Sequence, residues 1–336
     1  MENTSQDLRW RLAADEDAAR SQLQLFEDEA PQWRAGHGEF RGLEFLHVNA
    51  KRIINEVPAA SQMPFRFTIN AYRGCSHACV YCFARPTHEY LNLNAGEDFD
   101  RRIVVKVNAI ERTRAEVASK RWAGEAIAMG TNTDPYQRCE GKYRLTRGIV
   151  QVLRDAANPF SILTKSTLIL RDLEVLREAA GVTDVRLAFS IGTLDEEVWQ
   201  ATEPGTPHPR QRLAAVSRLN AAGIPTSVLV APILPGLSDS PEQIEAVVRA
   251  CTEAGAVSIS GLPLHLRTGV REVFMPWLEA YRPDLLPLYR NLFPKAYAPR
   301  SYQERIRALV STVPPDAPIP PPGPAATAVS LRFERR

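Results

Sequence analysis

Three of the five cysteines in the chain stand close together in the segment RGCSHACVYCFAR, as Cys75, Cys79 and Cys82. Their spacing is C-x3-C-x2-C, and the thiolate is the form in which cysteine binds metals. Closed zinc sites and ordinary iron–sulfur clusters take four protein ligands, so three thiolates leave one position unfilled. The segment therefore predicts either a metal site completed from elsewhere in the chain or a metal centre with an open position.

Length and composition are those of a globular protein. The 336 residues can form one large domain with extensions or two ordinary domains, and the net charge of +2 means that nucleic-acid binding would need a local basic face. The start, MENTSQDLRW, lacks a secretory pattern, and no later run approaches the roughly 18 apolar residues that span a bilayer. We therefore expect a cytoplasmic protein with no membrane segment, whose clustered cysteines serve metal or redox chemistry.

Six short apolar runs alternate with helical segments between Phe65 and Leu262: FRFTIN, EAIAMG, FSILTK, DVRLAFS, PTSVLVA and AVSISGL. Such runs are typical of parallel strands buried on both faces. Capping boxes, Thr193 with Glu196 and Ser240 with Gln243, predict two helix starts, and Cys251 continues the apolar face of the second helix.

The pattern predicts an α/β fold, a partial (β/α)6 TIM-like barrel of parallel strands with N- and C-terminal extensions. We expect an N-terminal extension at 1–64, a core barrel at 65–265, a helical extension at 266–312 and a proline-rich tail at 313–336. Loops after the strands of such a barrel meet at one rim. Polar residues follow the first four strands, at the cysteine loop, at TNTDPYQ, at Lys165 and at Ser190.

The cysteine spacing, with the aromatic Tyr81 before the third cysteine, resembles the signature of the radical S-adenosylmethionine superfamily. The segments MGTNTDPYQ, ILTKS, LAFSIGTLD and APILPGLSD resemble its subgroup related to spore photoproduct lyase. The resemblance implies that Cys75, Cys79 and Cys82 bind a [4Fe-4S] cluster, whose open iron binds S-adenosyl-L-methionine. It further implies reductive cleavage of that molecule to a 5′-deoxyadenosyl radical, with an electron from a ferredoxin- or flavodoxin-like donor.

The same resemblance assigns cofactor contacts. The methionyl amino group would meet the loop after the second strand, the carboxylate would lie at Lys165 and Ser190, and Tyr81 would pack at the adenine end. An ammonium satisfies a carboxylate, and short hydroxyls or an acid satisfy an ammonium. The loop residues concerned are Thr131, Asn132, Thr133 and Asp134.

One departure concerns the hydrogen donor. Spore photoproduct lyase carries a cysteine in the loop after the second strand, where this chain has Thr131 or Asn132, and Phe83 replaces a tyrosine of the lyase. This argues against thymine-dimer repair by the lyase's route. Cys139, several residues later in YQRCE, is the candidate substitute donor.

Alternatives remain open for the metal and the substrate. The cysteines could instead form a zinc site completed by His77 or His88. The subgroup implies a nucleic-acid base as substrate, and arginines with interleaved aromatics from Arg267 to Arg307 suit single-stranded nucleic acid. These aromatics could equally pack beneath a solvated helix face. Two other functions fit the sequence: radical modification of a peptide or tRNA, and non-catalytic binding of nucleic acid with a structural metal. The sequence does not indicate an oligomeric state.

Overall fold

The computed structural model describes residues 33–61 and 63–311. The expected proline-rich tail and most of the expected N-terminal extension lie outside these residues.

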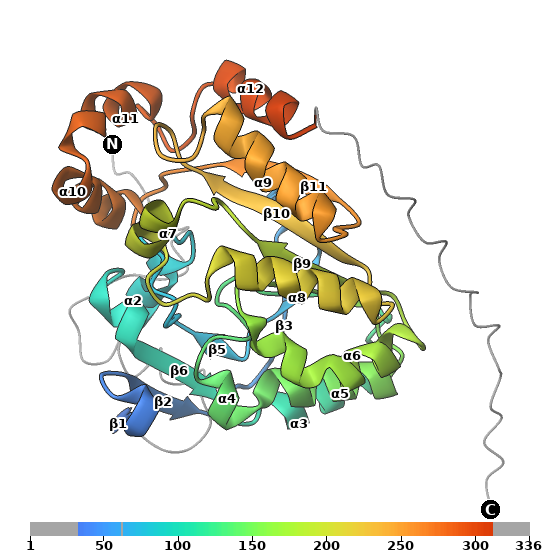
Figure 1. Ribbon diagram of the computed structural model, residues 1–336. Helices are drawn as coiled ribbons and strands as arrows, with labels where there is room; N and C mark the ends of the chain where they lie inside the picture. Colours follow the sequence, from blue (N-terminus) through green and yellow to red (C-terminus); the bar gives the residue numbers. More distant parts are fainter. Residues whose placement is uncertain (1–32, 62, 312–336) are drawn as a thin grey trace, which may run out of the picture.

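A seven-stranded sheet with the order β11-β10-β9-β8-β7-β4-β3 forms the centre of the molecule. Six of its strands are parallel, and β3 joins the edge antiparallel to β4. The six expected apolar runs supply the parallel strands, which confirms the α/β fold and the partial barrel (Figure 1). The strand bounds are β3 Ile54–Glu56, β4 Phe67–Ile69, β7 Ile127–Met129, β8 Phe160–Thr164, β9 Val185–Ser190, β10 Thr226–Ile233 and β11 Ile259–Pro263.

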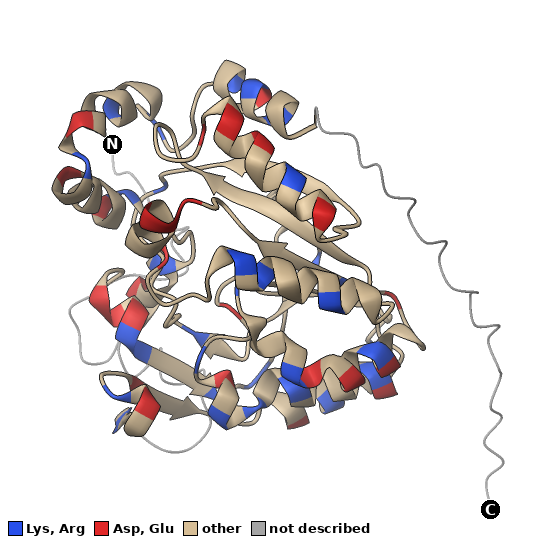
Figure 2. Cartoon of the chain, in the orientation of Figure 1, with Lys and Arg blue, Asp and Glu red and all other residues tan. Residues whose placement is uncertain are grey.

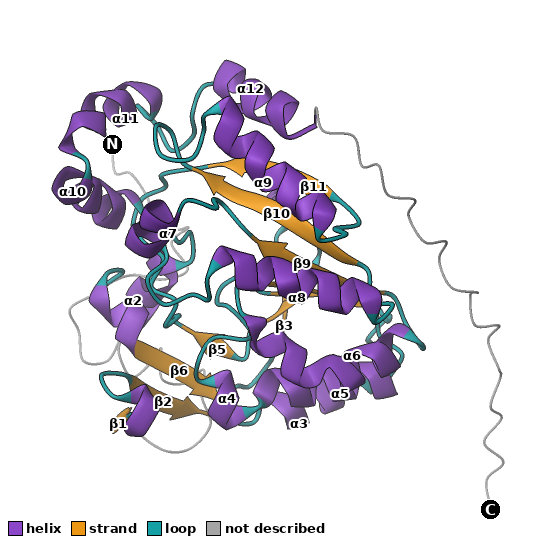
Figure 3. Ribbon diagram, viewed as in Figure 1, coloured by secondary structure: helices purple, strands orange, loops and turns teal. Residues whose placement is uncertain are grey.

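Helices follow the parallel strands and cover the outside of the sheet (Figure 3). The α-helices are α2 Glu97–Arg101, α3 Ala109–Val117, α4 Glu140–Tyr143, α5 Leu145–Asp155, α6 Leu173–Ala180, α7 Glu196–Thr202, α8 Pro209–Ala221, α9 Pro241–Glu253, α10 Arg271–Tyr281, α11 Leu286–Leu292 and α12 Arg300–Ser311. Short 3-10 turns are η1 Gly38–Phe40, η2 Ala59–Ser61, η3 Arg85–Leu91, η4 Thr167–Asp172 and η5 Pro283–Leu285.

A second, four-stranded sheet lies beside the barrel and was not expected. Its order is β1-β2-β6-β5, with β1 Trp33–Ala35, β2 Glu44–Val48, β5 Tyr72–Arg73 and β6 Arg102–Lys106. The sequence suggested that the first barrel strand runs directly into the cysteine loop, and the structure shows that it does not. Strand β4 ends at Ile69, and β5 pairs with β6 before the loop begins.

One of the two expected helix starts is confirmed. Ser240 and Gln243 form the reciprocal capping box of α9, and Cys251 is fully buried on its apolar face. The capping box predicted at Thr193 is wrong. The side chain of Asp195 caps α7 instead, by accepting a hydrogen bond from the amide of Val198. The Thr193 hydroxyl instead accepts from the amide of Asp195, which completes the turn that leads into the helix.

Two apolar clusters hold the elements together. The larger cluster lies between the sheet and its helices, and it includes Ile306 and Val310 of α12. The smaller cluster joins Phe274 of α10 and Tyr289 of α11 to the cysteine-loop residues Cys79 and Tyr81. Helices α10 and α11 therefore share an apolar cluster with the cysteine loop.

Charges of both signs alternate on the outer helices. Figure 2 shows Lys, Arg, Asp and Glu interspersed along α5 and α6, where Arg147 pairs with Glu174 and Arg154 pairs with Glu178. Within the described residues, no helix is long and apolar enough to cross a bilayer.

Candidate active site

The three clustered cysteines line one cavity at the carboxyl ends of the barrel strands. Cys75 and Cys79 are 6% and 7% exposed, and Cys82 is half-buried. The lining also includes residues at or just after the ends of several strands: Gly130, Thr133, Asp134, Thr164, Lys165, Ser190, Ala231, Pro263 and Leu264. Strand ends of a parallel barrel form its usual active-site face.

A buried arginine supports the cysteine loop from behind. Arg85 is 1% exposed, and its Nε and one terminal nitrogen donate to the carbonyl of Cys79 at 3.0 and 2.8 Å. The other terminal nitrogen donates to the carbonyl of Ala95 at 2.9 Å, and Asp100 balances the charge at 2.9 Å. This bonding fixes the main chain between the second and third cysteines.

The loop after β7 holds the start of the cysteine loop. The Thr133 hydroxyl and the Gln137 amide nitrogen both donate to the carbonyl of Gly74, at 2.6 and 3.0 Å. The Gln137 amide oxygen accepts from the amide of Ser76 at 3.0 Å. Gly130 makes the turn into this loop possible, because its φ is +90° and an added Cβ would lie 2.0 Å from the carbonyl oxygen of Leu163.

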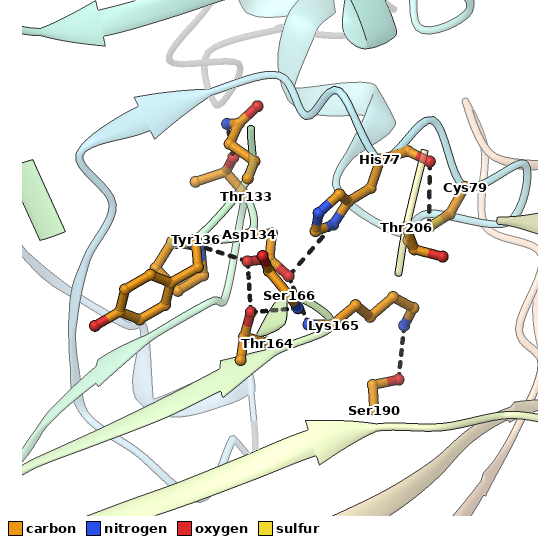
Figure 4. Close-up of polar contacts among 12 residues, drawn as sticks. His77, Cys79, Thr133, Asp134, Tyr136, Thr164, Lys165, Ser166, Ser190 and Thr206 are labelled. Atoms are coloured by element: carbon orange, nitrogen blue, oxygen red, sulfur yellow. Dashed lines mark hydrogen bonds and ion pairs between the residues drawn. The ribbon is translucent and has the colours of Figure 1, made fainter. Parts of the chain in front are cut away.

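Asp134 connects three loops of the site (Figure 4). Its Oδ1 accepts from the Thr164 hydroxyl and its Oδ2 accepts from the Lys165 amide, each at 2.7 Å. Oδ2 also lies 3.4 Å from Nδ1 of His77. Burial by itself would raise the pKa of Asp134, but His77 and these hydrogen bonds lower it below its ordinary value. Asp134 is therefore an ionised and well-satisfied anchor.

Lys165 and Ser190 meet across the ends of β8 and β9. The Lys165 ammonium donates to the Ser190 hydroxyl at 2.6 Å, and that hydroxyl donates to the carbonyl of Ala231 at 2.7 Å. The same ammonium lies 5.7 Å from the ring centre of Tyr81 and 3.9 Å from a carboxylate oxygen of Glu203. Lys165 lines the cavity, so its ammonium can bind an anionic group of a ligand there.

Glu203 and Arg212 support the site from behind, and neither was predicted from the sequence. Glu203 is 3% exposed, accepts from the Tyr81 hydroxyl and pairs with fully buried Arg212. Burial would raise the pKa of Glu203, but Arg212 and Lys165 lower it. Arg212 also donates to the carbonyl of Ser190 at 2.9 Å. Neither residue follows a strand directly, since Glu203 comes just after α7 and Arg212 lies within α8, so the sequence carries no local signal for them.

The remaining expected site residues take other positions. The Asn70 side chain bonds the Thr131 hydroxyl and the Asn132 amide, each at 3.1 Å, and neither residue is among the described residues that line the cavity. Of that loop, Thr133 and Asp134 do line it. Cys139 is fully buried in the larger apolar cluster, also outside the described lining. Its role as a hydrogen donor stays a prediction, and a donor there would act from behind the cavity wall.

The three thiols line one cavity, and each must lose its proton to bind a metal. Burial raises the pKa of Cys75, Cys79 and Cys82, so metal binding would release their protons. In the described part of the chain, no three or more His, Cys, Asp and Glu side chains converge on a point suited to one metal ion. Three cysteine thiolates on one loop that line a common cavity fit an iron–sulfur cluster, whose irons are bound by cysteine thiolates.

The two histidines considered for a zinc site have other partners. Nδ1 of His77 faces Asp134, as described above, and Nε2 of His88 lies 2.8 Å from the carbonyl of Arg102. The His88 ring also packs edge-on against Phe99 at 5.3 Å. Each histidine therefore has one ring nitrogen engaged, whereas Nδ1 of His88 has no hydrogen-bond partner within the described residues and His77 lines the cavity. A zinc site completed by either histidine stays a prediction.

Comparisons with known proteins agree with this geometry. The sequence model of the Radical SAM superfamily matches residues 69–255. The uncharacterized protein Rv2578c of Mycobacterium tuberculosis is 46% identical over 274 residues, covering 81% of each chain. The uncharacterized protein MJ0683 of Methanocaldococcus jannaschii is 30% identical over 199 residues, covering 59% of this chain and 70% of its own.

A solved structure has the same fold. Spore photoproduct lyase complexed with dinucleoside spore photoproduct aligns with a TM-score of 0.51 at 17% identity, and the alignment covers 71% of this chain and 66% of the lyase chain. At this identity the likeness extends to the fold alone. The family match spans more than half of the chain and includes all three clustered cysteines, so the protein belongs to the radical SAM superfamily and is a radical SAM enzyme.

Proposed function

We propose that this enzyme binds a [4Fe-4S] cluster through Cys75, Cys79 and Cys82, binds S-adenosyl-L-methionine in the same cavity, and removes a hydrogen atom from a nucleic-acid base. The observation that carries the proposal is the convergence of three thiols, the Lys165 ammonium and the Ser190 hydroxyl on one cavity. Membership of the superfamily implies both cofactors. When bound and reduced, the cluster would supply the electron that cleaves S-adenosyl-L-methionine to methionine and a 5′-deoxyadenosyl radical.

The chain's own residues would bind and orient the second cofactor. Lys165 offers its ammonium to the methionyl carboxylate, and Ser190 holds that ammonium in place. Glu203 fixes the Tyr81 hydroxyl, which sets the ring at the adenine end. The loop from Thr131 to Asp134 remains the proposed neighbour of the amino group, with Thr133 and Asp134 nearest the cavity.

Apolar residues of the lining would keep water from a reactive radical. Leu163, Leu229, Leu264 and Phe99 line the cavity together with the backbone around Pro232. A closed, apolar surrounding prevents side reactions of such intermediates. An external one-electron carrier, ferredoxin- or flavodoxin-like, would reduce the enzyme.

The nucleic-acid base is the finer part of the proposal. Its support is the fold shared with spore photoproduct lyase, whose solved complex holds a dinucleoside photoproduct. The absence of a cysteine at Thr131 or Asn132 leaves the hydrogen donor unassigned, so the product need not be that of the lyase.

A substrate panel tests the proposal. The reconstituted enzyme, reduced with dithionite, is incubated with S-adenosyl-L-methionine and with undamaged DNA, ultraviolet-treated DNA, tRNA or a peptide pool. We expect a nucleic acid to raise the rate of 5′-deoxyadenosine formation and to take up or lose label at a base. Stimulation by the peptide pool alone would contradict the nucleic-acid assignment, while no 5′-deoxyadenosine under any condition would contradict the enzyme chemistry.

A further inference from the structure

Large apolar side chains are exposed at the mouth of the cavity. Phe83 is 49% exposed and Leu262 is 45% exposed, and both line the cavity. Tyr297, in the C-terminal extension, is 49% exposed. Isolated exposed apolar residues are common, but a group of them beside a cavity marks a binding surface.

Three rings form a continuous row at this mouth. The ring centres of Phe83 and His265 are 6.4 Å apart, and those of His265 and Tyr297 are 5.6 Å apart. The Arg267 guanidinium lies 5.4 Å from the Tyr297 ring centre, and its Nε donates to the Tyr297 hydroxyl at 2.9 Å. We call Phe83, His265, Tyr297 and Arg267 the aromatic row. It runs from the residue after Cys82 to the C-terminal extension.

The backbone fixes the aromatic row in place. His265 forms an isolated β-bridge with Tyr297. On either side of His265, the amide of Leu264 donates to the carbonyl of Ile233 at 3.0 Å and the amide of Leu266 donates to that of Ala296 at 2.7 Å. Leu264 and Leu266 are both buried. A row held in this way loses little conformational freedom when a ligand binds.

Other aromatics of the extension do not contribute to such a surface. Tyr289 is fully buried, and Trp277, Tyr281 and Tyr302 are half-buried against the smaller apolar cluster. Tyr297 alone among these five is exposed. Of the aromatics expected at a nucleic-acid surface, Tyr297 is therefore the exposed one, and its ring contacts that of His265, which lines the cavity.

The chemistry of the row suits a planar heteroaromatic ligand near an anion. Nucleobases stack on aromatic and guanidinium faces with little sequence preference, and an arginine beside the rings can contact phosphate. Burial, and next the charge of Arg267, lowers the pKa of His265, which keeps its ring neutral. Its Nδ1 is buried and has no hydrogen-bond partner within the described residues. The row presents aromatic rings and a guanidinium group, not the strand edge or helix groove that commonly binds peptides.

We propose that the aromatic row stacks an unpaired base of a single-stranded or locally opened nucleic acid and so holds the neighbouring nucleotide at the cavity. The proposal deepens the proposed function and rests on it for the identity of the chemistry inside the cavity. The row itself is a binding site that can be tested without turnover.

Binding of a labelled single-stranded oligonucleotide to the reconstituted full-length enzyme, followed by fluorescence anisotropy, tests the row. We expect Tyr297→Ala to raise Kd by on the order of tenfold, the effect of losing one stacked base. Tyr297→Phe keeps the ring and should bind as the wild type does. Trp33→Ala is the matched control, because Trp33 is also exposed and lies 5.4 Å below an arginine, Arg102, but on the second sheet.

An abasic oligonucleotide of the same length separates stacking from charge. It keeps the phosphates, so we expect it to bind more weakly than the ordinary strand and to show no loss with Tyr297→Ala. Equal binding of the abasic and ordinary strands, or an unchanged Kd for Tyr297→Ala, would overturn the proposal. A peptide pool that binds more tightly than the oligonucleotide, and whose binding is weakened by Tyr297→Ala, would also overturn it.

The radical chemistry is followed separately. Formation of 5′-deoxyadenosine by dithionite-reduced wild-type enzyme without nucleic acid reports this chemistry alone, and it should be the same in the control variant Trp33→Ala. If the wild type forms none, the proposed function fails, and the anisotropy experiment still decides whether the row binds a base. If the wild type forms 5′-deoxyadenosine and Tyr297→Ala leaves the Kd for the oligonucleotide unchanged, only the row is wrong.

Discussion

Lys165 connects the ends of β8 and β9 and contacts three different kinds of side chain. Its ammonium bonds the Ser190 hydroxyl, lies near the Glu203 carboxylate and faces the Tyr81 ring, while its backbone amide bonds Asp134. The side chain is therefore held in one place at the cavity wall. A group held in this way can bind a carboxylate without being reoriented.

Replacing this lysine tests its proposed role. Lys165→Met keeps most of the side-chain volume but removes the charge, so we expect the Kd for S-adenosyl-L-methionine to rise by about 10- to 100-fold, the value of a hydrogen bond to a charged group. Isothermal titration calorimetry on reconstituted enzyme measures the change. Lys142→Met, which removes an exposed lysine on α4, is the control. Equal affinities in the two variants would mean that Lys165 does not contact the cofactor.

At this scale the sequence predicted residues that sit at strand ends. Lys165 and Ser190 follow apolar runs, and the cysteine spacing is a strong local pattern. Glu203 and Arg212 were missed because their partners depend on how the loop after β9 folds back onto the site. Gly205 allows this close approach, since an added Cβ would lie 2.2 Å from the carbonyl oxygen of Ser76.

The two sheets are joined by a buried lysine. Lys106 ends β6, and its ammonium donates to the carbonyl of Asn70, just after β4, at 2.8 Å. Asn70 in turn holds Thr131 and Asn132. Burial, and next the charge of Arg73, lowers the pKa of Lys106 from 10.5 to about 7.

This shift predicts how stability depends on pH. The unfolded lysine keeps its proton up to about pH 10.5, whereas the folded one releases it near pH 7, so the unfolded state binds more protons between these values. Relative to Lys106→Met, the free energy of unfolding of the wild type should be constant below pH 7 and rise by a few kcal/mol, on the order of 1.4 per pKa unit, as the pH approaches 10.5. Urea unfolding of both proteins across this range measures the difference, and a difference independent of pH would refute it.

Sequence periodicity located the barrel strands but not the second sheet. The parallel strands are rich in apolar residues and alternate with helical segments along the chain, which is a recognisable pattern. Strands β2 and β6 pair in parallel although η2, two barrel-sheet strands and the cysteine loop lie between them in the chain. Strand β5 has only two residues, too few for any period to be visible.

The C-terminal helices belong to two different parts of the core. Helices α10 and α11 pack over Cys79 and Tyr81, whereas α12 returns to β11 and α9. The return is close, since a Cβ on Gly261 of β11 would lie 2.6 Å from Cγ2 of Val310. The extension therefore covers the cavity side with the helices α10 and α11 and the barrel edge with α12 alone.

Truncating a core residue of α12 tests this arrangement. Ile306 is fully buried in the larger apolar cluster, so Ile306→Ala should lower the free energy of unfolding by about 2–5 kcal/mol. Arg307→Ala, one position along on the exposed side of the same helix, should change it by less than about 0.5 kcal/mol. Urea unfolding measures both. A small effect at Ile306 would mean that α12 is not part of the barrel core.

For the whole molecule, the fold class followed from the alternation of strands and helices, and the superfamily followed from the cysteine spacing. The division into a barrel at 65–265 and an extension at 266–312 stays a prediction, because residues on both sides of the boundary share the two apolar clusters. Which side chains of the extension face the cavity could not be predicted, since the tyrosines repeat along one segment and only three-dimensional packing distinguishes Tyr297 from the rest.

The central claim is that three thiolates hold an iron–sulfur cluster with an open position. The most direct test measures iron, sulfide and zinc per chain after anaerobic reconstitution. The proteins compared are the wild type, Cys75→Ala, Cys79→Ala and Cys82→Ala, with Cys251→Ala as the buried-cysteine control. We predict about four iron and four sulfide in the wild type and in Cys251→Ala, and a large loss in each of the other three variants. One zinc per chain without iron, or full iron in any of those three variants, would contradict the account.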